Sequence, residues 1–445
     1  MRFSIIVICS IMIWQTGWTQ VNENSPLSAL GIGDMSPPAL VAGQSLAGLY
    51  ATYYNGYNAN LMNPASYAGL SSTAFDVGFD ASYITIQDQN SKQSAWGGNL
   101  KYLSLSIPLT SPVNIVLDRK EQLFKMGMNI ALLPVSKMDY RINQKVVDEE
   151  GIAYRRQYGG KGGINKLQFG TGAQYRNLSG GVNVGFLFGS IKNEKSLTFE
   201  ESFNSHHTYT VNDRAYKGFV WDAGLLYRMY LRKWEEDRSK DRYISFGVYG
   251  NSKQPITIDQ KILTLRKSSD YAGLDDPNPD RSTVDTISID HPGRVSNSMP
   301  SQLGIGVSYS LANRLQTGIN FSLTNWESFK NTLNIGTLRN SWEAAASVEY
   351  TPNPNSLLNY WNRVSYRGTL YYHKDPREIH SEGLDEKGIR VGLGMPIFQQ
   401  RQMSYFNISV DYGQLNNNIF KENFVRFNIG ITLNNNLWFY KRRFE

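Results

Sequence analysis

The feature that most constrains this chain is a two-residue alternation of apolar and polar side chains, which begins at Thr73 and returns almost to the C-terminus. In the first run, Phe75 and Phe79 lie on one face while Asp76 and Asp80 lie on the other. Comparable runs span residues 181–191, 303–311, 315–323, 342–350, 363–372, 389–395, 406–412 and 425–433. Strict alternation of this kind predicts β-strands with one apolar and one polar face.

Two architectures use such strands. A soluble sandwich buries the apolar faces, whereas a membrane barrel turns them to lipid and turns the polar faces to its lumen. Many runs here are longer than the roughly five or six residues of soluble strands and approach the roughly 9–11 residues of membrane strands. Aromatic residues also fall near the run ends, at Tyr83, Tyr350, Tyr372 and Tyr412, as the girdles of membrane barrels require. The sequence therefore predicts an all-β fold, a transmembrane antiparallel β-barrel of about 14 strands over residues 73–445.

The connections between the runs fall into two classes that alternate along the chain. Tight turns are expected at 177–180, 311–314 and 399–402, and longer loops at 200–213, 266–283, 331–339, 374–387 and 414–423. Short periplasmic turns and longer external loops are typical of bacterial barrels. The runs near 284 and 303 are best interpreted as one long strand with a break.

Residues 1–20 are predicted to form a cleaved signal peptide. Arg2 provides the positive start, and an apolar run follows from Ile5 to Trp14. This run is too short for a membrane anchor, which needs about 20 residues. Cys9, the single cysteine, lies inside it; a lipidated cysteine is the alternative, but Ile8 before it is not small. The mature protein would then have no disulfide, no thiolate-bound zinc and no cysteine nucleophile.

Charge and histidine content weaken several other classes of function. The formal charge is +7, but it is spread along the chain without a basic stripe, which makes nucleic acid a poor partner. The five histidines show no triad arrangement, so we expect no enzyme; a surface hydrolase is the weakest alternative. His206 and His207 are expected to be solvated in an external loop. Residues 276–280 lack the glycine and glutamate of a calcium loop, and neither a metal nor a cofactor site is expected.

Residues 21–72 do not alternate and are rich in Gly, Pro, Ser and Asn. They also contain apolar residues such as Leu40, Val41 and Leu46, which a flexible tail does not need. We therefore expect a hatch, or plug, inside the barrel mouth rather than a tail. Within it, Asn63-Pro64-Ala65 stands just before the first strand, where the proline cannot donate to a ladder.

The order of these features resembles the outer-membrane long-chain fatty-acid transporter family (FadL/TodX type), in its Bacteroidetes-like branch. Besides Asn63-Pro64-Ala65, the resemblance rests on 162–166 (GGINK), 177–183 (NLSGGVN), 186–189 (FLFG), 299–306 (MPSQLGIG) and Trp326. It implies a 14-stranded barrel with an N-terminal hatch that contains Asn63, Pro64 and Ala65. It also implies passive transport of hydrophobic ligands, which leave sideways through an opening in the wall.

One feature departs from that family, because the face expected to line the lumen is markedly charged. The candidate lumen charges are Asp76, Asp80, Asp222, Glu343, Glu349, Arg363, Arg367, Arg390 and Arg426. Opposite charges could pair there and make the lumen rigid.

Two functions therefore stay open for an exported protein of a Gram-negative outer membrane, in contact with its lipid. The first is a channel for passive uptake of small hydrophobic compounds, with an apolar pocket and a gap in the wall. The second is a non-transport barrel that serves as partner or scaffold in a secretion or assembly complex, with a closed, charge-paired lumen and prominent loops.

Overall fold

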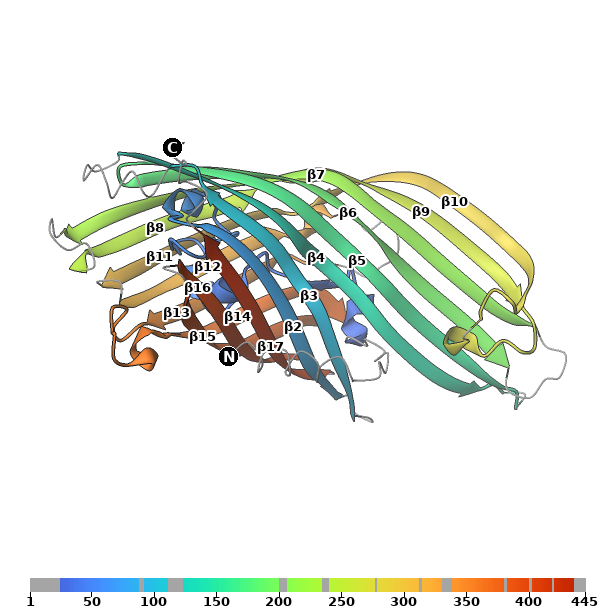
Figure 1. Ribbon diagram of the computed structural model, residues 1–445. Coiled ribbons are helices and arrows are strands. Elements are labelled where there is room, and N and C mark those ends of the chain that lie inside the picture. Colours follow the sequence, from blue (N-terminus) through green and yellow to red (C-terminus); the bar gives the residue numbers. More distant parts are fainter. Residues whose placement is uncertain are drawn as a thin grey trace, which may run out of the picture.

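The computed structural model describes residues 25–435 except 88–91, 111–122, 150, 200–205, 234–239, 277, 312–313, 330–337, 380–381, 400–401 and 418–419. The expected signal peptide, residues 1–20, lies outside these. The wall consists of antiparallel strands that pair in chain order and close where β17 meets β2 (Figure 1). The segments are β2 (Thr73–Gln87), β3 (Lys92–Pro108), β4 (Phe124–Val147), β5 (Ala153–Tyr175), β6 (Leu178–Phe199), β7 (His207–Arg232), β8 (Arg242–Asn251), β9 (Gln254–Lys267), β10 (Thr283–Met299), β11 (Ser301–Leu311), β12 (Leu315–Asn325), β13 (Ser341–Tyr350), β14 (Ser365–Ile379), β15 (Glu382–Gln399), β16 (Gln402–Asn416) and β17 (Lys421–Asn435).

Two of the strands are broken once. β8 and β9 follow each other along β7, and β10 and β11 pair with β9 and β8 in turn. The second break is at Pro300, which has no backbone N–H to donate. The Asn251 side chain donates to the carbonyl of Pro300 at 3.0 Å and so joins the two breaks. Sixteen segments with two breaks make 14 strands, which confirms the predicted barrel and the predicted broken strand over 284–311.

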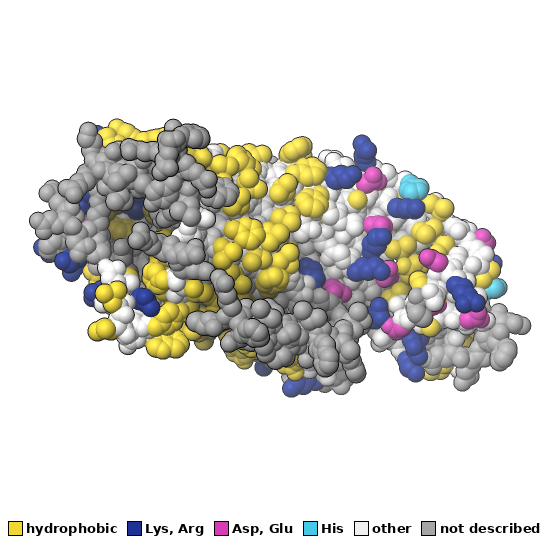
Figure 2. Space-filling view, viewed as in Figure 1, with side chains coloured by type: hydrophobic (Ala, Val, Ile, Leu, Met, Phe, Trp, Pro, Cys, Tyr) yellow, Lys and Arg dark blue, Asp and Glu magenta, His cyan; other side chains and the backbone are white. Residues whose placement is uncertain are grey.

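Apolar side chains form a band on the outer surface. Phe219 is 73% exposed and Ile319 is 64% exposed, and outward-facing apolar residues of the other strands are exposed as well. Figure 2 shows this band across the middle of the barrel, while charged side chains gather over the far ends of β4–β7, β9 and β10. At one border of the band, the rings of Tyr83 and Trp96 lie 4.8 Å apart. Such a band with an aromatic border suits lipid rather than water.

None of the helices among the described residues is long and apolar enough to cross a membrane.

Several strands are longer than the sequence runs indicated. β4 to β7 contain 24, 23, 22 and 26 residues, so they continue well beyond the apolar band (Figure 1). The predicted external loop 200–213 is therefore wrong over 207–213, while 200–205 lie outside the described residues. The predicted loop 374–387 is wrong in large part. β7 begins at His207, and β14 and β15 extend to Ile379 and from Glu382. The ladders continue there because strands with polar residues on both faces can still pair when both faces meet water.

Residues 25–72, the luminal segment, lie inside the barrel (Figure 1). The segment contains η1 (Pro26–Ala29), β1 (Asp34–Met35), α2 (Val41–Gln44), η2 (Ala47–Leu49) and η3 (Pro64–Gly69). These helices are too short to be stable alone, so packing and hydrogen bonds with the wall hold them. The backbone N–H groups of Val41 and Gly48 donate to Tyr102 Oη at 2.8 Å and Ser347 Oγ at 2.7 Å.

Inward-facing glycines of the wall allow this close packing. A Cβ on Gly181 of β6 would lie 2.4 Å from the carbonyl carbon of Pro64, and one on Gly247 of β8 would lie 2.0 Å from the carbonyl oxygen of Ala51. Side chains essentially never come this close to backbone atoms. The alternation of apolar residues with glycine at these strands is therefore explained by the backbone of the luminal segment lying directly against the wall.

Candidate functional site

The wall contains a gap between β3 and β4. The two strands pair only over Leu103–Pro108 and Gly127–Leu132. Beyond Leu132, β4 pairs with β5 on one side, and among the described residues no part of β3 pairs with its other side. Pro134 lies where the strands separate and breaks the register with β5, because proline cannot donate to a ladder.

This gap lies at the height of the apolar band. Leu100 of β3 is 50% exposed, and Trp96, at the border of the band, is 57% exposed. Ile130 of β4, just before the strands part, is 39% exposed. The opening therefore faces the same apolar surroundings as the outer band.

Residues 25–38, called the strap here, fill part of the gap from inside. Asp34 and Met35 of β1 pair with Lys137 and Ser136 of β4, and the N–H of Ser36 donates to the carbonyl of Val135 at 3.0 Å. Gly33 has φ +98°, and a Cβ there would lie 2.4 Å from the carbonyl oxygen of Lys137. Only glycine therefore allows the strap to lie this close to β4.

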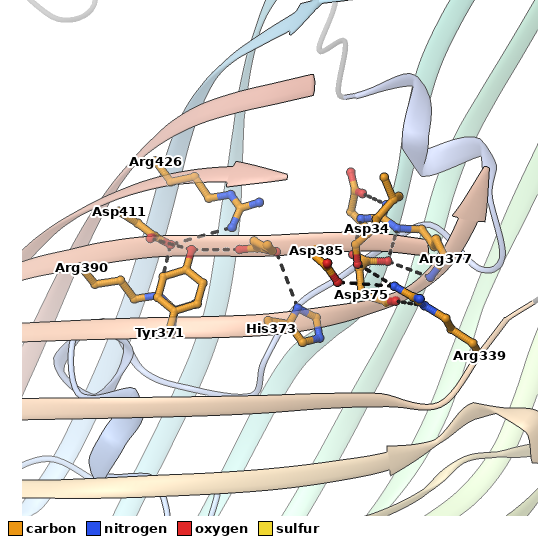
Figure 3. A network of polar contacts seen from close by, with 12 residues as sticks. Asp34, Arg339, Tyr371, His373, Asp375, Arg377, Asp385, Arg390, Asp411 and Arg426 are labelled. Atoms are coloured by element: carbon orange, nitrogen blue, oxygen red, sulfur yellow. Dashed lines mark hydrogen bonds and ion pairs between the residues drawn. The ribbon is translucent and has the colours of Figure 1, made fainter. Parts of the chain in front are cut away.

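A clamp from the far wall holds the strap. Arg377 of β14 contacts Asp34 Oδ1 through Nη1 at 2.5 Å, and the same nitrogen donates to the carbonyl of Leu27 at 3.3 Å. Its Nε and Nη2 donate to the two oxygens of Asp375, each at 2.8 Å. Figure 3 shows Arg377 between the two carboxylates. Asp375 is 4% exposed, so the clamp is a largely desolvated ionic contact.

A cavity of about 300 Å³, the upper cavity, adjoins the strap and the gap. Its apolar lining includes Met35, Pro37, Leu133, Val135, Val220 and Trp326. Its ionisable lining includes Lys166, Asp222, Glu343, Glu386, Arg390 and Arg426. The cavity thus has apolar residues beside the gap and charged residues both near it, at Lys166 of β5, and across the lumen, at Arg390 and Arg426. An apolar pocket and a charge-paired lumen, predicted as alternatives, therefore adjoin each other.

The charged wall is a connected network. Asp411 Oδ2 lies 3.3 Å from Arg390 Nε and 3.8 Å from Arg426 Nη1. The Tyr371 hydroxyl lies 2.9 Å from Glu386 Oε1 and 3.3 Å from Asp411 Oδ1, and its ring lies under the Arg390 guanidinium at 3.9 Å. Figure 3 shows these side chains in one row across neighbouring strands. Paired charges of alternating sign keep the wall polar without a large net field.

The candidate lumen charges do not form one site. Glu343, Arg390 and Arg426 line the upper cavity. Asp76 is 2% exposed and accepts from Thr432 Oγ1 at 2.5 Å. Arg367 donates to Glu349 Oε1 and Asn407 Oδ1, each at 2.8 Å. Asp222 pairs with Lys166 at 3.0 Å. Asp80 lies half-buried on β2, and Arg363 lies at the opposite mouth, where its guanidinium is 4.8 Å from the Phe398 ring.

Sequence reasoning missed the clamp and part of the network. Asp375, Arg377 and Glu386 fell in a stretch interpreted as a loop, and Asp34 lay in a segment without alternation. Asp411 was on the polar face of its run, but alternation alone does not show which charges meet.

One cluster has a composition that could hold a metal ion. Single ligand atoms of His373, Asp375 and Glu386 lie within 4.8 Å of one another. Both oxygens of Asp375 are already engaged by Arg377, however, and His373 Nδ1 lies 3.7 Å from Glu386 Oε2. Guanidinium groups beside the carboxylates oppose a second cation, so the cluster is better explained as part of the ionic network.

His207 differs from the expectation of a solvated loop residue. It begins β7 and is 3% exposed, and its Nδ1 accepts from the N–H of Phe199 at 3.2 Å. Its Nε2 lies 3.4 Å from the carbonyl of Ser269. Both ring nitrogens therefore have structural partners.

The luminal segment separates the upper cavity from a second, lower cavity of about 890 Å³ at the other mouth. No residue lines both cavities. Asn63, at the start of η3, is fully buried; its Nδ2 donates to the carbonyls of Ala51 at 2.6 Å and Leu225 at 3.3 Å, and its Oδ1 accepts from the N–H of Ala65 at 3.1 Å. Pro64 and Ala65 lie in the first turn of η3.

Three tyrosines of the luminal segment are deeply buried. Burial raises the pKa of Tyr50, Tyr53 and Tyr67, so their hydroxyls stay protonated. Tyr67 Oη donates to Asn183 Oδ1 of β6 at 3.0 Å.

Comparisons with known proteins agree with this architecture. The structure is similar to a Pseudomonas aeruginosa FadL homologue, with a TM-score of 0.53 and 13% identity over 90% of this chain and 99% of that one. It is also similar to the P. putida toluene transporter TodX, with a TM-score of 0.52 and 12% identity over 93% and 98% of the chains. A TodX deltaS2S3 mutant, a monoaromatic hydrocarbon channel, gives 0.50 at 13% identity over 89% and 99%.

No curated protein matches the sequence. The predicted FadL/TodX-type fold is confirmed by these structures, whereas the Bacteroidetes-like branch stays a prediction. A family model described as BamG matches residues 1–445. The chain therefore belongs to the BamG family and has the FadL-type barrel fold.

Proposed function

We propose that this protein is a Gram-negative outer-membrane channel for passive uptake of small hydrophobic compounds, exported with a signal peptide that is cleaved. The observation that carries the proposal is the position of the upper cavity. It is lined by the strap and by residues 133–135 of β4, at the point where the pairing of β3 and β4 stops. The strap is thus the single layer of polypeptide between a ligand in the cavity and the apolar surroundings of the wall.

A sideways route follows from the packing of the luminal segment. The segment, for which we propose the role of a hatch over residues 21–72, fills the lumen between the two cavities. A straight route would require Asn63 and its buried partners to separate. The sideways route requires the strap to move away from β4, where two register pairs and one further hydrogen bond hold it, and to leave its two contacts with Arg377.

The test is to lock the strap with a disulfide. Asp34 and Lys137 are antiparallel register partners, so Asp34→Cys with Lys137→Cys places the two Cβ atoms within reach of a disulfide. Cells that produce this variant would be assayed for uptake of radiolabelled toluene, before and after reduction, beside each single variant. We expect uptake to fall several-fold when the pair is oxidised and to return on reduction. Equal uptake in both states would exclude the sideways route.

The charge network and the long external strands favour a second function, a non-transport barrel that is a partner or scaffold in a secretion or assembly complex. The network connects neighbouring strands of one wall, and the ends of β4–β7 offer a large surface beyond the apolar band. Native mass spectrometry of protein extracted in mild detergent separates the two. A bound apolar compound that is lost in Asn63→Ala supports uptake, whereas an empty protein with stoichiometric protein partners supports the scaffold.

A further inference from the structure

The loop between β13 and β14, residues 351–364, exposes apolar side chains to an unusual extent. Leu357 is 93% exposed and Leu358 is 102% exposed, while Trp361 is 58% and Tyr360 is 37% exposed. The alternation pattern predicted no long connection here, at the end of the barrel where β5 and β6 are joined by a tight turn. Water is a poor environment for two adjacent, fully exposed leucines.

The loop is held in this shape by its own hydrogen bonds. The N–H of Asn353 donates to the carbonyl of Asn362 at 2.7 Å, and the N–H of Thr351 donates to the carbonyl of Arg314 at 2.7 Å. Asn359 caps η7 (Tyr360–Arg363) by accepting from the N–H of Trp361 at 3.0 Å. The apolar side chains are therefore presented by a defined turn.

The turn lies on the outer side of the wall. Tyr366 belongs to the outward series of β14, together with Leu370, which is 60% exposed. Its hydroxyl donates to the carbonyl of Trp361 at 3.3 Å, which places the backbone of η7 against the outer face. Leu357 and Arg363 of the same loop instead line the lower cavity.

From this placement we propose that residues 358–361 form a membrane anchor, which inserts into the headgroup–acyl boundary of the leaflet at this end of the barrel. Tyr350 and Tyr366, at the ends of the two strands, are 47% and 37% exposed on the outer face, so the turn continues the apolar band. Tyrosine and tryptophan favour this boundary because each has an apolar body and a polar group. Leu358 then reaches the acyl chains.

The anchor also has a defined position relative to the gap. Going round the wall from the β3–β4 gap to the β13–β14 loop, eight strands lie on one side and six on the other. The anchor and the gap are thus on nearly opposite sides of the barrel. An anchor there fixes one side of the barrel in the leaflet and leaves the side with the gap free of it.

Cysteine labelling tests the anchor. The single cysteine, Cys9, would be replaced in Cys9→Ser, and Leu358→Cys would be labelled with an environment-sensitive fluorophore. The protein would be reconstituted in phosphatidylethanolamine–phosphatidylglycerol vesicles that contain lipids with a nitroxide near the headgroup. We expect the label to be quenched several-fold more by the nitroxide lipid than by aqueous iodide, and Asn355→Cys in the same loop to show the reverse order.

Phe219→Cys, in the outer band, separates failure of the anchor from failure of the membrane location on which it rests. If Phe219→Cys is quenched by the nitroxide while Leu358→Cys is quenched by iodide, the barrel is in the membrane and the anchor is wrong. A label at Leu358→Cys that neither quencher reaches would show a protein cover, such as a second copy, and would also overturn the proposal.

Discussion

Arg377 and Asp34 are 343 positions apart in the sequence, and their side chains meet at 2.5 Å inside the barrel. The contact joins the strap, which fills part of the wall gap, to the opposite side of the lumen. Because Arg377 also holds both oxygens of Asp375, one guanidinium connects the strap to β14 of the wall.

Asp34→Asn should loosen the strap without disturbing the wall. The amide removes the charge that Arg377 contacts, while the pair with Asp375 remains. Since the Asp34 side chain is 33% exposed, we expect a loss of only about 1 kcal/mol. Hydrogen exchange of residues 33–36 should rise roughly fivefold, with no change in the strands. Unchanged exchange in the strap would show that Arg377 does not hold it.

Arg377→Met should destabilise the whole barrel, because it leaves the buried Asp375 carboxylate without its cation. Breaking a buried pair in this way costs about 3–5 kcal/mol. The double variant Asp375→Asn with Arg377→Met should recover most of the loss. The check is the urea midpoint for unfolding in detergent or vesicles; a single variant as stable as the double one would contradict the pairing.

Gly33→Ala should prevent the strap from lying against β4. Its Cβ would meet the Lys137 carbonyl oxygen at 2.4 Å, at a backbone φ of +98°. The efficiency of the Asp34→Cys/Lys137→Cys cross-link should fall several-fold in this background. Gly43→Ala is the matched control, since a Cβ there has no neighbour within 4 Å, and it should leave the cross-link intact.

Asn63→Ala should weaken the packing of the luminal segment between the two cavities. The variant leaves buried carbonyls of Ala51 and Leu225 without their donor, at a cost of about 1–3 kcal/mol. In planar bilayers we expect more frequent current steps than in the unaltered protein. Asn355→Ala, at an exposed loop position, should behave like the unaltered protein, and equal currents in all three would show that Asn63 does not limit the closed state.

The strands could be predicted from sequence because alternation is a local property. The neighbours Phe79 and Asp80 mark the apolar and the polar face of their strand, whatever surrounds it. The same pattern in the other runs gives the 14 strands. The extent of β14 could not be predicted, because His373 to Ile379 carry polar residues on both faces and look like a loop.

Features that depend on contacts between distant segments could not be predicted from the sequence either. Pro134 cannot donate to a ladder, but the sequence alone does not show which neighbouring strand separates from β4. Nothing local to Asp34 shows that Arg377 lies opposite, since the closed barrel alone brings them together. Asp411 could be assigned to the lumen face, whereas its position between Arg390 and Arg426 depends on the register of three strands.

The length of β4 to β7 sets how far the protein stands above the cell. The 26 residues of β7 span about 85 Å at roughly 3.3 Å per residue, or about 65 Å along the barrel axis at a tilt near 40°. The hydrocarbon layer takes about 30 Å of that height. The remainder extends beyond the hydrocarbon layer, so the ends of β4–β7 form a curved wall along one side of the barrel mouth.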